Sequence, residues 1–299
     1  MDGRDRYALF DAERHRADVR RFALSARMPE ALARGEFVVE YQPLVRLCDQ
    51  RMVGVEALVR WQLPSGRRLG PDEFVPLAEQ TGLIVPLGRA VLTEACRAAA
   101  GWAAADPDYP LLLSVNLAAR QVREPDIVTE IARILAETGW HPELLQLELT
   151  ESDLMGTSGE SLGALRALAA MGVRIAIDDF GTGYSNLAYL RHLPVHTLKL
   201  AGTFVTGAQL RDGLLAAPPG EAADEADNRV VAAVIQLAGV LGLSVTAESV
   251  ETDAQLERLR QLGCDTGQGW YFARAVPSDE VPALLHCPPW LSGAPAAGR

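Results

Sequence analysis

The sequence predicts an α/β protein built as a (β/α)8 TIM-like barrel. From about residue 36 onward, eight short apolar runs alternate with helix-like patterns, an alternation typical of parallel sheets with helical crossovers. The length involved, about 250 residues, fits one such barrel. Polar residues follow several of the apolar runs, at the strand ends where a barrel gathers its functional groups. A doubly wound sheet fits the same alternation and stays the alternative.

The predicted strands are short runs rich in branched and aromatic residues, which favour extended backbone. In chain order they are Phe37–Tyr41, Val53–Val59, Leu111–Leu117, Leu145–Leu149, Val173–Ile177, Thr197–Leu200, Leu243–Ala247 and Gly269–Phe272. Between them, apolar residues recur at helical spacing. The clearest predicted helices are Pro86–Ala100, Ile127–Thr138, Ser161–Met171 and Arg229–Leu241.

Three segments fall outside this alternation and set the expected limits of the domain. Residues 1–28 are dense in Arg, Asp and Glu and predict a solvated helical leader before a barrel over residues 29–285. Residues 208–228 include the stretch LLAAPPGEAADEADN, whose Pro, Gly and acidic residues predict a mobile surface loop. Residues 286–299 predict a flexible tail.

The composition excludes several classes of protein. With 48% hydrophobic and 22% charged residues, the chain is globular rather than disordered. Its net charge of −11 argues against binding a DNA or RNA duplex. No run approaches the roughly 18 apolar residues of a membrane span, and no signal peptide is evident. Four scattered cysteines indicate neither a zinc site nor a disulfide framework. We therefore expect a cytoplasmic domain without membrane contact.

Lys199 is the single lysine among 28 basic residues, the other 27 being arginines. A coding bias toward arginine explains the arginines, and a surviving surface lysine is the plain explanation of the exception. Lysine, however, is a compact charge whose pKa can be shifted, whereas arginine is planar and always charged. The retention of Lys199 therefore suggests chemistry that arginine cannot supply.

Polar side chains stand at the carboxyl ends of the predicted strands. They are Glu56, Asn116, Glu148, Asp178, Asp179, Lys199, Glu248 and Gln268. Each acid alone could be a helix cap or a solvated turn residue, but their recurrence at successive strands predicts one shared site. Hard oxygen ligands suit Mg²⁺ or Mn²⁺ rather than zinc.

So many carboxylates in one barrel mouth would repel one another without cations between them. Two divalent ions sharing a carboxylate relieve this repulsion and activate water against a phosphodiester, whereas glycoside hydrolysis needs only two carboxyl groups. Lys199 would then lie beside the attacking water or a phosphate oxygen. The stretch IDDFGTGYSNLAYL, with its two glycines, predicts a loop whose backbone approaches a ligand closely.

Eight motifs in order along residues 29–277 resemble those of the EAL-domain family of cyclic di-GMP phosphodiesterases. They are Tyr41–Pro43 (YQP), Glu56–Trp61 (EALVRW), Asn116–Leu117, Glu148–Glu151 (ELTE), Asp178–Leu187 (DDFGTGYSNL), Leu198–Leu200 (LKL), Ala247–Thr252 (AESVET) and Gln268–Gly269 (QG). The resemblance implies a modified barrel and hydrolysis of cyclic di-GMP to linear pGpG with two Mg²⁺ or Mn²⁺ ions, and inhibition by Ca²⁺.

The resemblance also implies a role for each matching residue. Glu56, Asn116, Glu148 and Asp178 would hold one ion, and Asp178, Asp179 and Glu248 the other. The residues of the catalytic step would be Lys199, Glu56, Glu248 and Gln268. The residues that bind the substrate would be Gln42, Arg60 and Asp179.

The resemblance further implies a loop that couples dimerisation to catalysis. Glu151 would anchor this loop, whose residues include Gly181, Thr182, Gly183, Tyr184 and Ser185. A homodimer is therefore expected. The leader resembles the linker between a GGDEF domain and an EAL domain, so a GGDEF or sensor domain in a parent protein is an expected partner.

The chain departs from the family pattern near Lys199 and Glu248. Ala201 and Gly202 stand where the family usually has aspartate and arginine, Ser249 replaces a glycine, Asn186 a serine and Trp270 a tyrosine. Loss of the acid at 201 would leave Lys199 less well positioned, and Ser249 would be strained if its backbone needs positive φ. Three functions follow: an active phosphodiesterase, a degenerate module that binds cyclic di-GMP as a sensor, and a protein-interaction module with a vestigial site.

Overall fold

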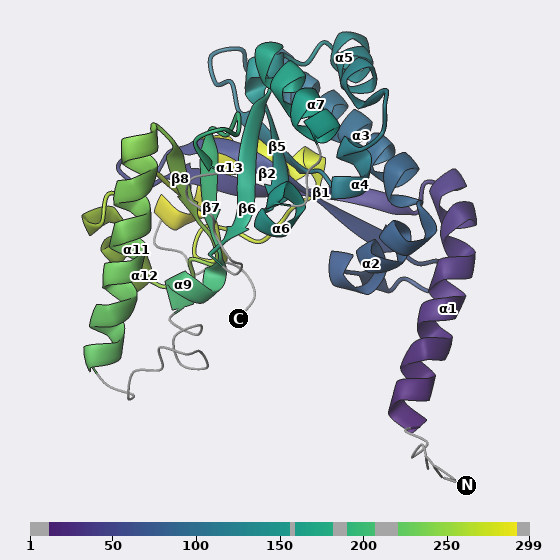
Figure 1. Cartoon of the computed structure of the whole chain (residues 1–299), viewed down its shortest axis with the longest axis horizontal. Coiled ribbons are helices and arrows are strands. Elements are labelled where there is room, and N and C mark those ends of the chain that lie inside the picture. The colour runs from purple at the N-terminus through teal and green to yellow at the C-terminus, as the bar shows by residue number, and fades with distance from the viewer. Residues whose placement is uncertain (1–11, 156–158, 182–189, 207–220, 292–299) are drawn as a thin grey trace, which may run out of the picture.

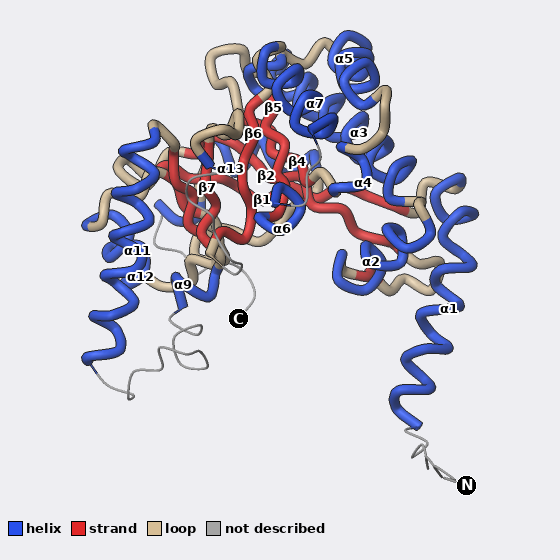
Figure 2. The backbone as a smooth tube through the Cα atoms, viewed as in Figure 1, coloured by secondary structure: helices blue, strands red, loops and turns tan. Residues whose placement is uncertain are grey.

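The fold was analysed in a computed structural model of the 299-residue chain, which describes residues 12–155, 159–181, 190–206 and 221–291. Its strands are β1 Phe37–Arg46, β2 Met52–Gln62, β3 Arg68–Leu69, β4 Leu112–Asn116, β5 Leu145–Thr150, β6 Arg174–Phe180, β7 Thr197–Leu200, β8 Ser244–Ala247 and β9 Thr266–Gly267. Figure 2 shows them gathered at the centre of the molecule, with helices around them.

The strands close into a barrel. Their order is β1-β9-β8-β7-β6-β5-β4-β2-β3, and β1 also pairs with β2. Eight strands therefore form the ring, and β3 lies outside it, paired with the end of β2. This closure confirms the predicted TIM-like barrel and excludes the doubly wound sheet. β1 differs from the other strands of the ring because it runs antiparallel to both β2 and β9, while the remaining neighbours in the ring are parallel.

The helices bury their apolar faces against the barrel. They are α1 Ala12–Ala33, α2 Pro71–Thr81, α3 Ile84–Ala105, α4 Ala119–Val122, α5 Ile127–Thr138, α6 Glu151–Met155, α7 Gly159–Ala170, α9 Gly202–Thr206, α11 Glu221–Leu241, α12 Asp253–Gln261 and α13 Val281–His286. Figure 1 shows α3, α5 and α7 on one side and α11 and α12 on the opposite side. None of the helices in the described ranges is both long and apolar enough to span a bilayer.

Residues 12–28 of the predicted leader are helical, and α1 continues past residue 28 to Ala33; residues 1–11 lie outside the described residues. Its last turns are part of the core, since Met28 and Ala31 are buried. Earlier in the helix, Val19 and Phe22 are exposed, as expected for a solvated segment. Figure 1 shows the start of α1 extending away from the barrel.

Two predicted elements are wrong. The last strand is Thr266–Gly267 rather than Gly269–Phe272, because the backbone turns back at Gly269, whose carbonyl accepts hydrogen bonds from Phe272 N at 3.1 Å and Ala273 N at 3.3 Å. Part of the expected loop over residues 208–228 is helical, since α11 begins at Glu221. Alanine and glutamate favour helices, and acids suit a helix N-terminus. Residues 207–220 lie outside the described residues.

The expected flexible tail begins with ordered structure. Residues Pro289–Leu291 form a 3-10 turn, and the indole of Trp290 is buried against the barrel. Its Nε1 donates a hydrogen bond to Gln50 O at 3.0 Å. Burial of a large aromatic ring stabilises this segment. Residues 292–299 lie outside the described residues.

The strands β2 and β4 pack closely at Gly54. A Cβ atom at this position of β2 would lie 2.5 Å from the backbone oxygen of Leu112 on β4, whereas at Gly101 in α3 it would meet no atom within 4 Å. We expect Gly54→Ala to lower the free energy of unfolding by about 1–3 kcal/mol. Gly101→Ala, the control, should raise it by about 1 kcal/mol. Urea unfolding measures both, and equal effects would contradict the packing argument.

Candidate active site

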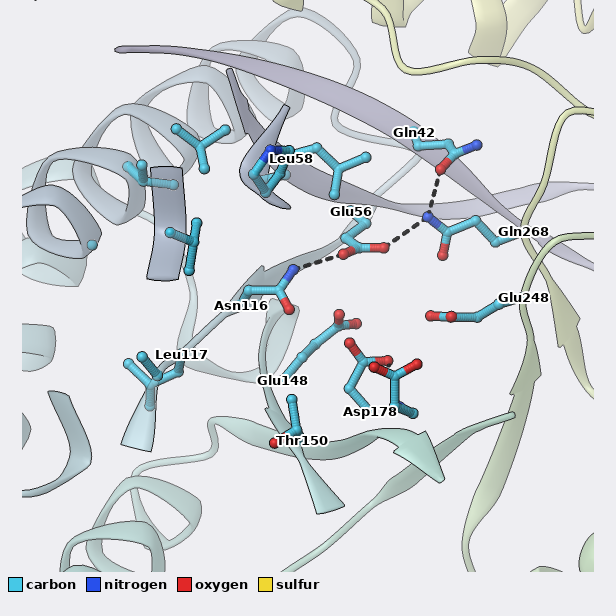
Figure 3. A pocket seen from close by; sticks show the side chains of 18 of the residues that line it. Gln42, Glu56, Leu58, Asn116, Leu117, Glu148, Thr150, Asp178, Glu248 and Gln268 are labelled. Atoms are coloured by element: carbon cyan, nitrogen blue, oxygen red, sulfur yellow. Dashed lines mark hydrogen bonds between the residues drawn. The ribbon is translucent and has the colours of Figure 1, made fainter. Parts of the chain in front are cut away.

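The predicted functional side chains meet at one end of the barrel. The carboxyl ends of parallel strands lie on the same side of a barrel. The structure brings together one residue from the middle of β2, residues in the C-terminal halves of β4, β5, β6 and β7, and residues in the segments that follow β8 and β9. These residues are Glu56, Asn116, Glu148, Asp178, Asp179, Lys199, Glu248 and Gln268. Figure 3 shows six of these side chains directed toward a common space, those of Glu56, Asn116, Glu148, Asp178, Glu248 and Gln268.

Lys199 is the positive centre of the site. Its side chain is 1% exposed, and Nζ lies 2.6 Å from Glu148 Oε2, 2.7 Å from Glu248 Oε1, 3.2 Å from Asp178 Oδ1 and 3.3 Å from Glu56 Oε2. Burial would lower the pKa of Lys199, but the facing carboxylates raise it well above its usual value. The ammonium is therefore charged and held from four sides.

The carboxylates outnumber this one cation. Burial first, and then repulsion from Glu56, raise the pKa of Glu148 well above its usual range despite the attraction of Lys199. Burial also raises the pKa of Glu248 to about 8, against the opposing effect of Lys199 and with repulsion from Asp178. A site that holds this much negative charge favours the binding of further cations.

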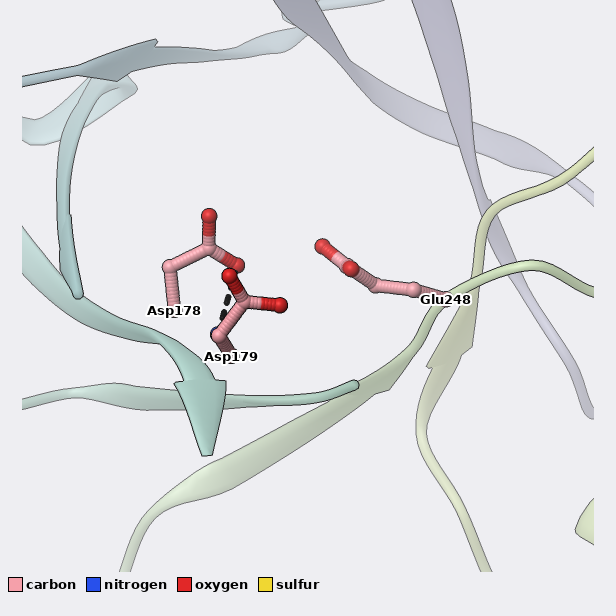
Figure 4. Close-up of side chains that lie close together, drawn as sticks. All are labelled: Asp178, Asp179 and Glu248. Atoms are coloured by element: carbon pink, nitrogen blue, oxygen red, sulfur yellow. Dashed lines mark hydrogen bonds between the residues drawn. The ribbon is translucent and has the colours of Figure 1, made fainter. Parts of the chain in front are cut away.

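Asp178, Asp179 and Glu248 form the part of the site best arranged for a metal ion. One oxygen from each lies within 4.8 Å of the others, and Figure 4 shows Glu248 facing the aspartates across a gap. Asp179 holds a left-handed backbone with φ +52°, and its N–H donates to Asp178 Oδ1 at 3.0 Å. Burial and the Asp178 charge raise the pKa of Asp179. Three carboxylate oxygens gathered in this way could hold a divalent metal ion.

Amide side chains fix Glu56 on its other sides. Asn116 Nδ2 donates to Glu56 Oε1 at 2.7 Å, and Gln268 Nε2 donates to Glu56 Oε2 at 2.7 Å and to Gln42 Oε1 at 2.9 Å. Figure 3 shows this row of contacts. Gln268 Oε1 is buried and has no hydrogen-bond partner among the described residues, so it can accept a hydrogen bond from a molecule bound in the site.

The site opens into a cavity of about 550 Å³ with two kinds of wall. The acidic wall contains the carboxylates described above. The apolar wall comes from β2, β4, α2 and α3 and includes Leu58, Val59, Val75, Ile84, Leu87, Val91 and Leu117. Trp270, 52% exposed, lines the cavity too. Sequence reasoning missed the apolar wall, because its residues read as ordinary core positions.

Arg60 and the loop residues differ from the rest of the predicted site. The Arg60 guanidinium does not line the cavity, and its Nε donates to Glu40 Oε2 at 3.0 Å. Glu151 does contact the start of the predicted loop, since its Oε2 accepts a hydrogen bond from Gly181 N at 3.0 Å. Thr182, Gly183, Tyr184, Ser185 and Asn186 lie outside the described residues.

Comparison with known proteins identifies the family. The sequence pattern of the EAL domain matches residues 25–275. The chain belongs to the EAL-domain family. "Uncharacterized protein Rv1357c" of Mycobacterium tuberculosis is 42% identical over 269 residues, covering 90% of this chain and 84% of the relative. "Bifunctional diguanylate cyclase/cyclic di-GMP phosphodiesterase MucR" of Pseudomonas aeruginosa is 38% identical over 284 residues, covering 95% of this chain but 39% of MucR.

A solved structure agrees with the fold of this EAL domain. The complex of PaMucR phosphodiesterase with c-di-GMP matches with a TM-score of 0.78 and 39% identity, covering 87% of this chain and 99% of that one. The barrel fold of this chain is therefore also found in a relative of known structure.

Two of the departures from the EAL pattern, Gly202 and Ser249, lie next to each other. Ser249 adopts φ +56°, which confirms that a glycine-like backbone is required there. A Cβ atom at Gly202 would lie 2.3 Å from Ser249 Oγ and 2.6 Å from Ser249 Cβ, so the serine occupies space that only a glycine at 202 leaves open. Ala201 is buried, and the four carboxylates around Lys199 hold its ammonium without an acid at 201.

Ser249 and Gly202 should therefore be energetically coupled. Ser249→Gly should raise the free energy of unfolding by about 1 kcal/mol, because it relieves the left-handed backbone. Gly202→Ala should lower it by about 1–3 kcal/mol through the clash with Ser249. The double variant should recover most of that loss. Urea unfolding of all four proteins gives the coupling, and strictly additive effects would argue against the contact.

Glu248 should make the metal-free EAL domain less stable as the pH rises. Its pKa is about 8 when folded against an ordinary 4.5, so between these values the folded state keeps a proton that the unfolded state has lost. The free energy of unfolding then falls with pH, by up to about 1.4 kcal/mol per pH unit from this group.

Urea unfolding in EDTA at about pH 5.5, 6.5 and 7.5 measures how the free energy of unfolding changes with pH. Glu248→Gln should make the slope shallower, and saturating Mn²⁺ should flatten it, because the ion replaces the proton. The assignment to Glu248 fails if wild type and variant have the same slope.

Proposed function

We propose that this EAL domain is a divalent-metal-dependent phosphodiesterase that hydrolyses cyclic di-GMP to linear pGpG. The observation that carries the proposal is the convergence of Asp178, Asp179 and Glu248 oxygens within 4.8 Å of one another, beside the buried ammonium of Lys199. Membership of the EAL family supports it, as does similarity to MucR, whose name includes cyclic di-GMP phosphodiesterase.

The donor set suits two ions of Mg²⁺ or Mn²⁺, which prefer carboxylate and amide oxygens. One ion would be held by Glu56, Asn116, Glu148 and Asp178, and the other by Asp178, Asp179 and Glu248. When bound, such ions polarise a phosphodiester and allow water to act as a nucleophile near neutral pH. Ca²⁺ is larger and prefers longer bonds and more ligands, so we expect it to inhibit.

The residues of the chain supply positioning and charge. Lys199 Nζ, fixed by four carboxylates, would stabilise the negative charge that develops on the phosphate. Gln268 Oε1, which is buried without a partner among the described residues, would accept a hydrogen bond from the attacking water and so orient its lone pair. Asn116 and the Gln268 amide hold Glu56 on both oxygens, which keeps the carboxylate in place.

The two walls of the cavity match the two parts of a cyclic dinucleotide. The acidic wall with its bound ions would take the phosphodiester. The apolar wall, including Leu58, Val91 and Leu117, and the Trp270 ring at the rim would take a purine, since aromatic and apolar surfaces favour the faces of bases. The predicted contact of Gln42 follows from its place in the cavity lining, whereas Arg60 would have to leave Glu40 to reach a phosphate.

The remaining expectations belong to the same proposal. Glu151 would couple the following loop to the site through its bond to Gly181. A homodimer, a GGDEF or sensor partner and a cytoplasmic location stay predictions. Binding without hydrolysis is the competing function, which the replacement of the usual aspartate by Ala201 favours.

A turnover assay with purified protein and Mn²⁺ or Mg²⁺ tests the proposal. Cyclic di-GMP should be converted to pGpG, and Ca²⁺ should suppress the reaction. Lys199→Arg is the matched variant, because four carboxylates between 2.6 and 3.3 Å from Nζ leave no room for a planar guanidinium. We expect it to lower kcat by about 10²–10³-fold.

The variant also distinguishes this enzyme from a contaminating phosphodiesterase, whose activity it would not change. Unaltered turnover in Lys199→Arg would refute the role of Lys199. Binding of cyclic di-GMP in calorimetry, with no pGpG formed in the presence of either metal, would identify a binding module instead.

A further inference from the structure

The interior layer beneath the active site is polar, whereas the inside of such barrels is usually filled by Val, Ile and Leu. Alternate residues of a strand face the same side, so residues two positions before the site residues lie directly below them. On β4, β5, β7 and β8 these are Ser114, Gln146, Thr197 and Thr246. All four are buried. Buried polar groups need hydrogen-bond partners, and three of them bond to one another.

A chain of hydrogen bonds runs through this layer to Glu148. Ser114 Oγ donates to Glu148 Oε1. Gln146 Nε2 donates to Ser114 Oγ at 2.9 Å, and Thr197 Oγ1 donates to Gln146 Oε1 at 2.8 Å. Ser244 Oγ lies 3.0 Å from Thr197 Oγ1. The chain thus joins β4, β5, β7 and β8 across the barrel interior.

The register of the strands explains how the chain crosses the barrel. Ser114 pairs with Gln146 across β4 and β5. Between β5 and β7, Ala176 of β6 pairs in register with Glu148 on one side and Thr197 on the other. Its small side chain leaves room for the Gln146 amide to reach the Thr197 hydroxyl. The polar layer is therefore a feature of the fold rather than of one strand.

The hydrogen bonds donated by Thr197, Gln146 and Ser114 all run toward Glu148. When Glu148 is ionised, as it must be to hold a metal ion, it only accepts hydrogen bonds. The single Ser114 proton then goes to Glu148, and Ser114 accepts from the Gln146 amide nitrogen. The Gln146 oxygen then takes the single Thr197 proton. The opposite amide orientation would give Ser114 two acceptors for one proton. Aligned donors polarise one another, which stabilises negative charge on Glu148.

Glu148 is thereby held on both oxygens by the protein. Oε2 accepts a hydrogen bond from Lys199 Nζ at 2.6 Å. Oε1 accepts one from Ser114 Oγ and a longer one from Gln146 Nε2 at 3.4 Å. Because a carboxylate offers about four lone-pair sites, capacity for a metal ion remains on this buried group.

We propose that Ser114, Gln146 and Thr197 are positioning residues that orient Glu148 for divalent-metal binding. The inference rests on the proposed function in one respect, since it takes Glu148 to be a metal ligand. Groups that orient a metal ligand from behind typically change metal affinity or activity by about 10- to 100-fold when they are removed. A purely structural polar layer would change the stability of the barrel and leave metal affinity as it is.

Mn²⁺ binding to the full chain without nucleotide, measured by calorimetry and by the electron paramagnetic resonance signal of free Mn²⁺, tests this role. Ser114→Ala and Gln146→Met should each weaken Mn²⁺ affinity by about 10- to 100-fold. Thr197→Val, farther along the chain, should weaken it by a few-fold, and Thr197→Ser should restore it. Thr246→Val is the matched control, because it removes a buried hydroxyl of the same layer that lies outside the chain of hydrogen bonds to Glu148.

A double-mutant cycle separates positioning from packing. In a Glu148→Gln background, Ser114→Ala should no longer change Mn²⁺ affinity. Thermal unfolding of each variant shows whether it folds, and if Ser114→Ala does not, the Thr197 pair decides the question. Wild-type Mn²⁺ affinity in folded Ser114→Ala or Gln146→Met, or an equal loss in Thr246→Val, would overturn the inference, as would a parent chain that binds no Mn²⁺. A parent that binds Mn²⁺ but does not turn over cyclic di-GMP would refute the proposed function alone.

Discussion

The contact of one buried ammonium with four carboxylates is the constraint on which the rest of the site depends. Lys199 is 1% exposed and faces Glu56, Glu148, Asp178 and Glu248. Removing charges from water is costly unless they are paired, and here the negative charges exceed the positive one. Burial first, and then repulsion between the carboxylates, raise the pKa values of Glu148 and Glu248. The folded chain is therefore built around a charge imbalance that divalent cations can relieve.

The barrel makes this concentration of charge possible. Its strands end in register on one side, so each contributes one side chain to the mouth, and the period of two along a strand places a second layer below. Most of the interior is apolar and supplies the stability. Under Glu148 the layer is polar instead, and Ser114, Gln146 and Thr197 exchange hydrogen bonds in one direction. The same geometry that collects the ligands thus provides support for one of them.

Much of this arrangement could be predicted from the sequence, because strand ends and period-two faces follow from local patterns. The positions of Glu56, Asn116, Glu148, Asp178 and Lys199 are of this kind. The antiparallel direction of β1 is not among the predictions, although the length of one connection indicates it. The segment between Arg46 and Met52 is too short for a parallel crossover, which needs a dozen or more residues. The partner of Arg60 could not be predicted, since a guanidinium suits a phosphate and the Glu40 carboxylate equally, and only the register of β1 on β2 decides between them.

Taken one at a time, the departures from the family pattern at Ala201, Gly202 and Ser249 suggest a weakened site. Their positions in the structure suggest instead that the side chains there pack differently. Ala201 alone implies that Lys199 has lost a companion, yet Lys199 keeps four carboxylate contacts. Ser249 alone implies strain, and its φ of +56° bears this out, but its side chain fits only because residue 202 has no Cβ. Gly202 leaves the space that the Ser249 side chain fills. Glu248, the neighbour of Ser249, still has a carboxylate oxygen within 4.8 Å of those of Asp178 and Asp179, so the exchange at 202 and 249 leaves these candidate metal ligands together.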